Sequence, residues 1–162
     1  MYIMMAQKAN VLLKKHNITE FPVPVHIVEQ IIIEKKYKIQ ILKHLRDKAV
    51  TIDDAVLVGT ASGSGYRECL VHESCHIQYH AGNQLQKNKW QVAKDEGQAQ
   101  AFAAYFLMPL GIFEAAMREN ECSYYLSEEF GVTVELVEHR KHLLISLLES
   151  GEYSMLTNAK FF

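Results

Sequence analysis

The residues from His72 to His76 read His-Glu-Ser-Cys-His, an H-E-x-x-H pattern that constrains both local fold and chemistry. On an α-helix each residue turns the chain by about 100° and advances it by about 1.5 Å. His76 then lies roughly 40° around the helix from His72 and about 6 Å further along, so both imidazoles can converge on one metal ion. Glu73 lies on the adjoining part of that face, where its carboxylate can reach a water molecule beside the metal. The pattern predicts a helix with two metal ligands, His72 and His76, and one catalytic base, Glu73.

The flanking sequence favours a helix at this place. Residues 66–71 contain neither proline nor glycine, and Gly82 offers a stop signal. Apolar side chains give the helix a flank to bury: Leu70, Val71, Cys75 and Ile77. The alternative is a surface helix that carries histidines without binding a metal.

A catalytic zinc site needs three protein ligands and one open position, so a third ligand has to come from elsewhere in the chain. Glu96 is the best candidate, because Ala99 and Ala103 follow it at helical spacing and would let its helix approach the first one closely. The alternative is that Glu96 and its neighbour Asp95 only place negative charge near a helix N-terminus, where such charge is favourable. If Glu96 does not ligate, Asp95 is the second choice.

The rest of the chain predicts an α+β domain in which a small, mainly antiparallel sheet packs on the H-E-x-x-H helix and further helices surround it. We expect helices at residues 6–16, 25–34, 66–79, 92–107, 111–119, 123–130 and 134–148, and strands at residues 37–42, 49–52 and 55–58. A small-residue loop at 61–65 leads into the metal-binding helix, and residues 149–162 carry no clear pattern.

Length and charge narrow the classes of protein. A chain of 162 residues is the size of one domain, in which residues 1–60 supply N-terminal helices and the sheet, 65–107 the metal-binding helices and 110–148 a C-terminal helical part. A formal net charge of −2 argues against general affinity for nucleic acids or acidic membranes. No apolar run is long enough to span a bilayer, and the N-terminus lacks the order of a signal peptide, so we expect a cytoplasmic protein.

Cysteine usage agrees with a reducing compartment. The three cysteines, Cys69, Cys75 and Cys122, are an odd number without C-x-x-C spacing, which argues against a disulfide framework. Cys75 directly precedes His76 and could be an extra ligand, but burial as a small apolar residue is the commoner fate of a free cysteine.

Three segments of the sequence resemble the ImmA/IrrE family of metallopeptidases. They are Arg67-x-x-Leu70-Val71-His72-Glu73-x-x-His76, Glu96-x-Gln98-Ala99-x-x-Phe102-Ala103-Ala104 and Leu107-Met108-Pro109. Members of that family typically read H-E-x-G-H, then E-x-E/Q-A-N/D-x-F-A, then L-M-P. Segments near both ends, Phe21-Pro22-Val23-Pro24-Val25 and Phe130-Gly131-Val132-Thr133 with Val137 and Arg140, also fit, though less specifically.

The resemblance implies a zincin-like fold and a peptidase that uses one catalytic Zn²⁺. It implies His72, His76 and Glu96 as the metal ligands, with Glu73 as the base, and no other cofactor. It also implies a protein substrate, typically a cytoplasmic helix-turn-helix repressor or regulator of a phage, a mobile element or a stress response. Binding to nucleic acid or to a membrane is not expected of such an enzyme.

The sequence departs from the family pattern at two positions near the site. Cys75 replaces the usual glycine of the motif, and because cysteine is small we expect the fold to accept it. Gln100 stands where Asn or Asp is common, which can alter the hydrogen bonds that support the metal ligands.

The group that stabilises the oxyanion is not singled out by the sequence. His80 continues the stripe of His72 and His76 by one turn, so it could support a ligand or face the oxyanion. Tyr79 and, more weakly, Tyr66 are further candidates for such a role. The alternative for His80 is an ordinary structural hydrogen bond.

Two rival functions remain open. Residues 126–140 read like a helix-turn-helix, which would suit a DNA-binding regulator, but four glutamates crowd that segment where DNA binding needs cations. The other rival is a non-catalytic, metal-stabilised adaptor that controls a regulator by binding alone. Glu73 argues against the adaptor, because a purely structural zinc site has no use for a base and closes all four positions.

Overall fold

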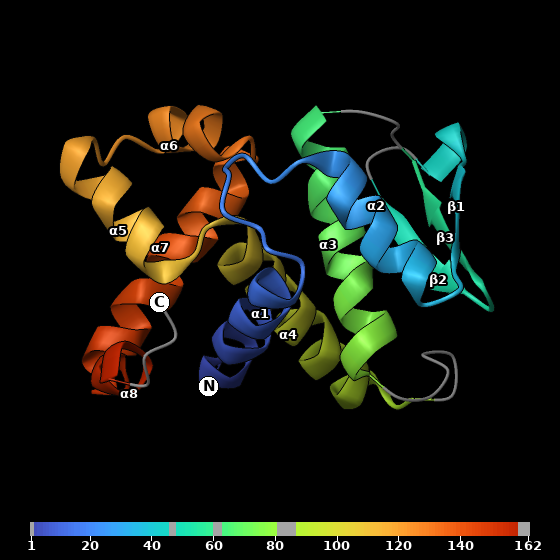
Figure 1. Ribbon diagram of the computed structural model, residues 1–162. Coiled ribbons are helices and arrows are strands. Elements are labelled where there is room, and N and C mark those ends of the chain that lie inside the picture. The colour runs from blue at the N-terminus through green and yellow to red at the C-terminus, as the bar shows by residue number, and fades with distance from the viewer. Residues whose placement is uncertain (1, 46–47, 60–62, 81–86, 159–162) are drawn as a thin grey trace.

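The computed structural model describes residues 2–45, 48–59, 63–80 and 87–158. The helices are α1 (Ile3–Lys15), α2 (Val25–Glu34), α3 (Gly63–Tyr79), α4 (Lys89–Leu107), α5 (Leu110–Glu119), α6 (Ser123–Phe130), α7 (Val134–Glu149) and α8 (Tyr153–Asn158). The strands are β1 (Lys38–Ile41), β2 (Ala49–Ile52) and β3 (Ala55–Val58), and a short 3₁₀ turn, Lys43–Leu45, lies between the first two. Figure 1 shows the sheet at one end of the molecule, α3 between the sheet and α4, and α5 to α8 at the opposite end.

The α+β fold class is confirmed, and most elements lie where the sequence predicts them. Helix α4 begins three residues earlier than expected because of a capping box: the Asn88 side chain accepts from the backbone of Gln91, whose side chain accepts from the backbone of Asn88. Helix α3 begins at Gly63, inside the predicted loop, of which residues 61–62 lie outside the described residues, as does Gly82.

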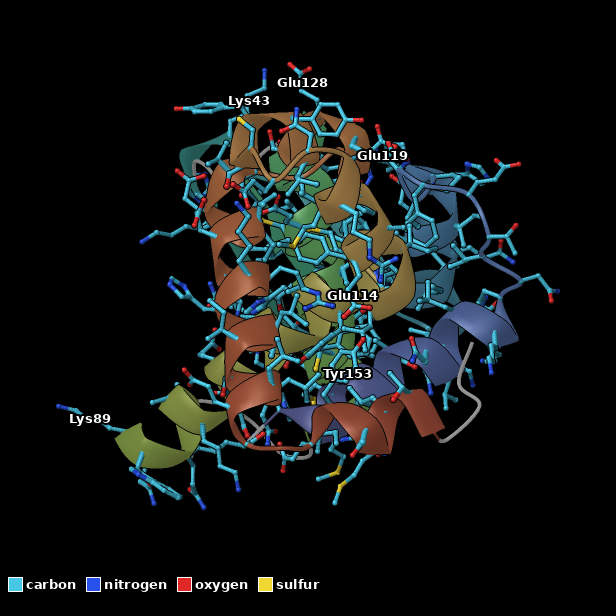
Figure 2. All side chains as sticks on the ribbon, turned by 90° about the vertical axis from the view of Figure 1, so that its left-hand side faces the viewer. Lys43, Lys89, Glu114, Glu119, Glu128 and Tyr153 are labelled. Atoms are coloured by element: carbon cyan, nitrogen blue, oxygen red, sulfur yellow. The ribbon has the colours of Figure 1, made fainter. Side chains whose placement is uncertain are left out.

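Helix α8 was not predicted from the sequence. Leu156 of α8 is buried, and the Tyr153 hydroxyl donates a hydrogen bond of 3.1 Å to Glu114 of α5 (Figure 2). This short helix is therefore held by tertiary contacts, which leave little periodic pattern in six residues.

The sheet has the order β1-β3-β2 and is mixed: β2 and β3 are antiparallel, as expected, whereas β1 and β3 are parallel. A tight turn with Asp53 at φ +51° joins β2 to β3. After this turn, β3 runs back between β2 and β1. It is therefore the central strand and is parallel to β1. Strand β2 is left as an edge strand, and it contacts α3.

Helix α4 forms the centre of the core. Its second half is buried almost completely, and it packs against α1, α3 and α7. Alanines and a glycine in α4 make these close approaches possible. Gly97, for example, lies against the side chain of Tyr2, the residue that precedes α1. Among the described residues no single helix is long and apolar enough to cross a bilayer, and α4 and α5, which together would reach that length, are bent by 65° at their junction.

Gly131 ends α6 in the left-handed conformation, with φ +59°, and starts the turn into α7. A Cβ atom at this position would lie 2.6 Å from Nη1 of Arg67 and 3.0 Å from Pro22. Arg67 of α3 donates from Nε to the Val23 carbonyl (2.8 Å) and from Nη1 to the Gly131 carbonyl. The turn between α6 and α7 is thus fastened to α3.

We expect Gly131→Ala to destabilise the fold by about 2–4 kcal/mol, because it adds crowding to the cost of a left-handed alanine. Gly151→Ala is the matched control: this glycine has φ +73° but open space around its Cβ position, so only about 1–2 kcal/mol is expected. Urea denaturation of both variants measures the difference. Equal losses would mean that Arg67 and Pro22 move aside without cost.

Candidate metal centre

Two imidazoles of α3 and one carboxylate of α4 converge on one point. His72 Nε2 lies 3.1 Å from Glu96 Oε2, and His76 Nε2 lies 3.3 Å from Glu96 Oε1. The two histidine Nε2 atoms are 3.1 Å apart. Close packing of α3 on α4 places them together, since α4 presents Ala99 and Ala103 on the same side. The structure thus brings together all three side chains expected to ligate the metal.

These spacings suit a tetrahedral ion. Ligand arms of 2.0–2.1 Å at tetrahedral angles put neighbouring ligand atoms about 3.3 Å apart. The distance between the two histidine nitrogens here is 3.1 Å, and their distances to the two different oxygens of Glu96 are 3.1 and 3.3 Å. Glu73 lies close to the same point: one of its carboxylate oxygens and one ring nitrogen of each histidine lie within 4.8 Å of one another. The donor set, two imidazole nitrogens and a carboxylate, is one that zinc accepts.

The protonation states also fit a cation. Burial, followed by the neighbouring His72, lowers the pKa of His76 to about 4, so its imidazole is neutral near pH 7 and can present a lone pair. The hydrogen bond with His72 comes first among the causes that lower the pKa of Glu96, which keeps that carboxylate ionised. The side chain of His76 is 6% exposed whereas that of Glu96 is 47% exposed, so the group opens toward solvent on the α4 side.

Glu73 is buried beside this group and is held by the sheet. Thr51 of β2 donates a hydrogen bond of 2.6 Å from Oγ1 to Glu73 Oε2. Burial raises the pKa of the Glu73 carboxyl, and the hydrogen bond from Thr51 acts in the opposite direction. The hydrogen bond restrains the carboxylate through one of its two oxygens, Oε2.

His80 lies behind His76, on the side away from Glu96. His80 Nδ1 lies 2.9 Å from His76 Nδ1, and His80 Nε2 lies 3.0 Å from Gln98 Oε1. Burial lowers the pKa of His80, so its ring is neutral near pH 7 and carries one proton. The Gln98 carbonyl oxygen can only accept, so that proton sits on Nε2, and Nδ1 of His80 must accept from His76. His76 is thereby left with a bare Nε2 that faces Glu96.

The structure places the remaining predicted residues elsewhere. Asp95, the second choice for the third ligand, faces away from the two Nε2 atoms and pairs with Lys87 at 2.6 Å and His80 at 3.9 Å. The Tyr79 ring packs edge-on against Phe102 and is not among the residues that line the cavity described below. The Tyr66 hydroxyl donates to Glu29 of α2 at 2.7 Å, which turns it toward α2.

The two departures from the family pattern have different surroundings. Cys75 is fully buried, and burial raises the pKa of its thiol to about 12, so it packs as an apolar residue, as expected. Gln100 is exposed and lines the cavity one turn after Glu96. Gln100 makes none of the hydrogen bonds described above among the candidate ligands and His80, whereas Gln98 makes one, to His80.

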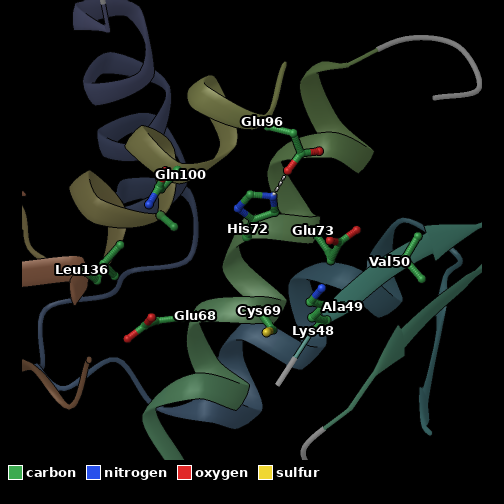
Figure 3. Close-up of a pocket in the computed structure, with 11 residues that line it drawn as sticks. Lys48, Ala49, Val50, Glu68, Cys69, His72, Glu73, Glu96, Gln100 and Leu136 are labelled. Atoms are coloured by element: carbon green, nitrogen blue, oxygen red, sulfur yellow. Dashed lines mark hydrogen bonds and ion pairs between the residues drawn. The ribbon is translucent and has the colours of Figure 1, made fainter. Parts of the chain in front are cut away.

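A cavity of about 360 Å³ opens beside His72, Glu73 and Glu96 (Figure 3). It is lined by Lys48, Ala49 and Val50 from the start of β2, Glu68, Cys69, His72 and Glu73 from α3, Glu96, Gln100 and Ala103 from α4, and Leu136 from α7. Sequence reasoning missed the contributions of β2 and α7, and of Thr51. These residues carry no local motif, and only a correct strand pairing would have brought them to the site.

Comparison with known proteins gives one match. The family described as the IrrE N-terminal-like domain, Peptidase_M78, matches residues 59–142, which include α3, α4 and the first half of α7. No curated protein and no solved structure matches the chain.

Proposed function

The chain belongs to the IrrE N-terminal-like family, a family of metallopeptidases, and from that membership we propose that it is a zinc-dependent endopeptidase. In this proposal His72, His76 and Glu96 hold one zinc ion, and Glu73 is the general base. The observation that carries it is the convergence of the two imidazoles on the Glu96 carboxylate: their Nε2 atoms lie 3.1 Å apart, and each lies 3.1–3.3 Å from one of the two Glu96 oxygens. These distances are close to those between neighbouring ligand atoms around a tetrahedral ion. His72, Glu73 and Glu96 all line the cavity, so a bound ion would be accessible from it.

A zinc ion held there would make a water molecule acidic and polarise the peptide carbonyl. The protein supplies the proton transfers. Glu73 takes a proton from the attacking water, whose oxygen forms a bond to the carbonyl carbon. Glu73 then gives the proton to the nitrogen of the departing amine as the C–N bond breaks. Its raised pKa brings it nearer to neutral pH, which suits a group that both accepts and returns a proton.

Thr51 and His80 position the two reacting parts of the site. The Thr51 hydroxyl restrains Glu73 at 2.6 Å, so the orientation of the carboxylate is set by the sheet. His80 accepts from His76 and so selects the tautomer in which Nε2 is available to the ion. We therefore assign His80 to ligand support and leave the oxyanion donor unassigned.

His80→Ala should weaken zinc binding about 10–100-fold, because outer hydrogen bonds to a ligating histidine carry that much of the affinity. Competition with a chromophoric chelator measures the zinc affinity directly, without reference to activity. His142→Ala, which removes an exposed histidine of α7, is the control and should bind zinc as the wild type does. An unchanged affinity in His80→Ala would reduce His80 to a structural residue.

A protein substrate agrees with the shape of the site. The cavity is open and has the edge strand β2 as one wall, and an edge strand can pair with an extended peptide segment. From the family resemblance we propose that the substrate is a cytoplasmic helix-turn-helix repressor or regulator. We also propose that residues 1–162 form one catalytic domain, because the buried core draws on α1, α2, β3 and every later helix.

The rival functions receive less support. In a helix-turn-helix protein the first turn of the second helix enters the major groove. Here the first turn of α7 lies against α3: Thr133 donates from its backbone and its hydroxyl to Glu68, and Leu136 lines the cavity. A non-catalytic adaptor would have no use for Glu73 or for the hydrogen bond from Thr51 that orients it.

The test of the proposal is direct. The zinc-loaded protein is incubated with each helix-turn-helix regulator that is found encoded near its gene, and the products are identified by intact-mass spectrometry. We expect one pair of fragments that add up to the repressor plus one water, and none after removal of the metal with a chelator. Binding of an intact repressor, with no fragments from any neighbouring regulator, would favour the adaptor.

A further inference from the structure

The cavity extends beyond the metal ligands in one direction. Glu68 lies four residues before His72 on α3, which is about 6 Å along the helix axis. Leu136 of α7 and Gln100 of α4 lie on the same side of His72 as Glu68, opposite to Val50 of β2 (Figure 3). This distal half of the cavity is bounded by Glu68, Gln100 and Leu136, and by Ala103, which follows Gln100 by about one turn of α4. Cys69 lies between Glu68 and Lys48, at the border of this half (Figure 3).

The distal half combines apolar walls with one carboxylate. Ala103 and Leu136 are buried in the protein, with 2% and 5% exposure, and Cys69 is half-buried. Glu68 accepts one hydrogen bond at each oxygen, from the backbone N–H of Thr133 and from its hydroxyl at 3.0 Å. An ionised carboxylate has about four acceptor positions, so two remain on Glu68 after both bonds to Thr133.

Charge in the cavity is unbalanced at this end. Three carboxylates line the cavity, Glu68, Glu73 and Glu96, against one cation, Lys48, which is exposed at the start of β2. A zinc ion would balance Glu73 and Glu96, which lie beside it, and leave Glu68. The neighbouring Arg67 attracts Glu68 through its charge, but its guanidinium hydrogen-bonds the carbonyls of Val23 and Gly131 and not Glu68.

The pKa of Glu68 also indicates that its negative charge is only partly compensated. Burial raises the pKa of the Glu68 carboxyl; the two hydrogen bonds from Thr133 lower it, and the nearby Glu135 raises it again. Arg67 lowers it slightly, and the direction is upward in sum, so these partners offset only part of the cost of burying the charge. A cation placed in the distal half would supply that compensation.

We infer that the distal half of the cavity is a side-chain subsite that selects a lysine or arginine next to the scissile bond. The aliphatic stem of such a residue would pack between Ala103 and Leu136, as long cationic side chains do on apolar surfaces, while its charged end meets Glu68. This inference rests on the proposed peptidase function and adds to it the class of residue that the enzyme recognises.

A matched pair of small metal-directed ligands tests the subsite. Lysine hydroxamate and norleucine hydroxamate share the zinc-chelating group and the length of the stem, and they differ in the terminal ammonium. Titration calorimetry on the zinc-loaded protein should show the lysine compound binding about tenfold more tightly. In Glu68→Gln the ratio of the two affinities should fall to about one, whereas Glu135→Gln, which neutralises an exposed neighbour outside the cavity, should keep it.

Each other outcome overturns one specific claim. Equal affinities in the wild type, or tighter binding of glutamate hydroxamate, would overturn the subsite while the peptidase proposal stands. A lysine preference that survives in Glu68→Gln would overturn the role of Glu68. If Glu68→Gln does not fold, Leu136→Lys replaces it, because a fixed cation in the opposite wall should abolish the preference. Failure of every hydroxamate to bind the zinc-loaded protein would overturn the metal centre and the subsite with it.

Discussion

Glu73→Gln is expected to reduce peptide-bond hydrolysis about 10³-fold or more while the protein keeps its zinc. Glutamine has the size of glutamate and can still accept a hydrogen bond from Thr51, but it cannot take a proton from water at neutral pH. General acid–base catalysis contributes 10²–10⁴-fold, and Glu73 is proposed to act at two proton transfers in the cycle. The measurements are kcat with the cleaved regulator and zinc content by elemental analysis.

The pairing of these two measurements separates the possible causes. Loss of activity together with loss of zinc would mean that Glu73 is a ligand, since its carboxylate and the two histidines have ligand atoms within 4.8 Å of one another. Thr51→Val is the accompanying variant: it keeps the carboxylate and removes its restraint, so it should lower kcat by a smaller factor, on the order of tenfold. Full activity in Glu73→Gln would contradict the proposed mechanism.

Glu96→Ala is expected to abolish both zinc binding at micromolar metal and activity, because only two ligands would remain of the three that a catalytic zinc site uses. Asp95→Asn is the matched control, on the neighbouring position of the same helix. Its carboxylate faces Lys87 and His80, so the variant should keep the ion. Zinc content and the zinc-dependent shift of the melting temperature measure both variants.

The thermal shift gives a readout that does not depend on a substrate. An ion present at 100 times its dissociation constant stabilises the folded protein by about 2.7 kcal/mol. Wild type and Asp95→Asn should therefore melt at a higher temperature when zinc is added, and Glu96→Ala should not. The opposite result, with zinc lost from Asp95→Asn and kept by Glu96→Ala, would move the third ligand to Asp95.

The centre of the site could be predicted because its residues are placed by local sequence patterns. His72, Glu73 and His76 are placed by helical periodicity alone, and Glu96 follows from the small residues that let its helix come close. Residues 25–34, 49–52, 55–58 and 123–130 were predicted with the bounds that the structure has. In each case proline, glycine or a change of hydrophobic period marks the ends.

The outer parts of the site depend on pairings between distant segments. Thr51 is 22 residues from Glu73 in sequence, and Glu68 is 65 residues from Thr133. Nothing in the local pattern around Thr51 shows that β3 inserts between β1 and β2 and leaves β2 beside α3. The stripe of His72, His76 and His80 was visible, but the role of His80 became clear only with Gln98 opposite its second nitrogen.

Helix α4 carries Glu96 on one turn and the centre of the core on the next three. A displacement of α4 large enough to widen the cavity would therefore break up the packing of α1, α3 and α7 as well. Strand β2 is less firmly packed: it is half-buried at most, and among the described residues it pairs with β3 alone. The cavity thus has one rigid wall, formed by α4, and one more deformable wall, formed by β2. Adjustment to the bulk of an incoming polypeptide falls to the sheet, which also carries the restraint on the proton-transferring group.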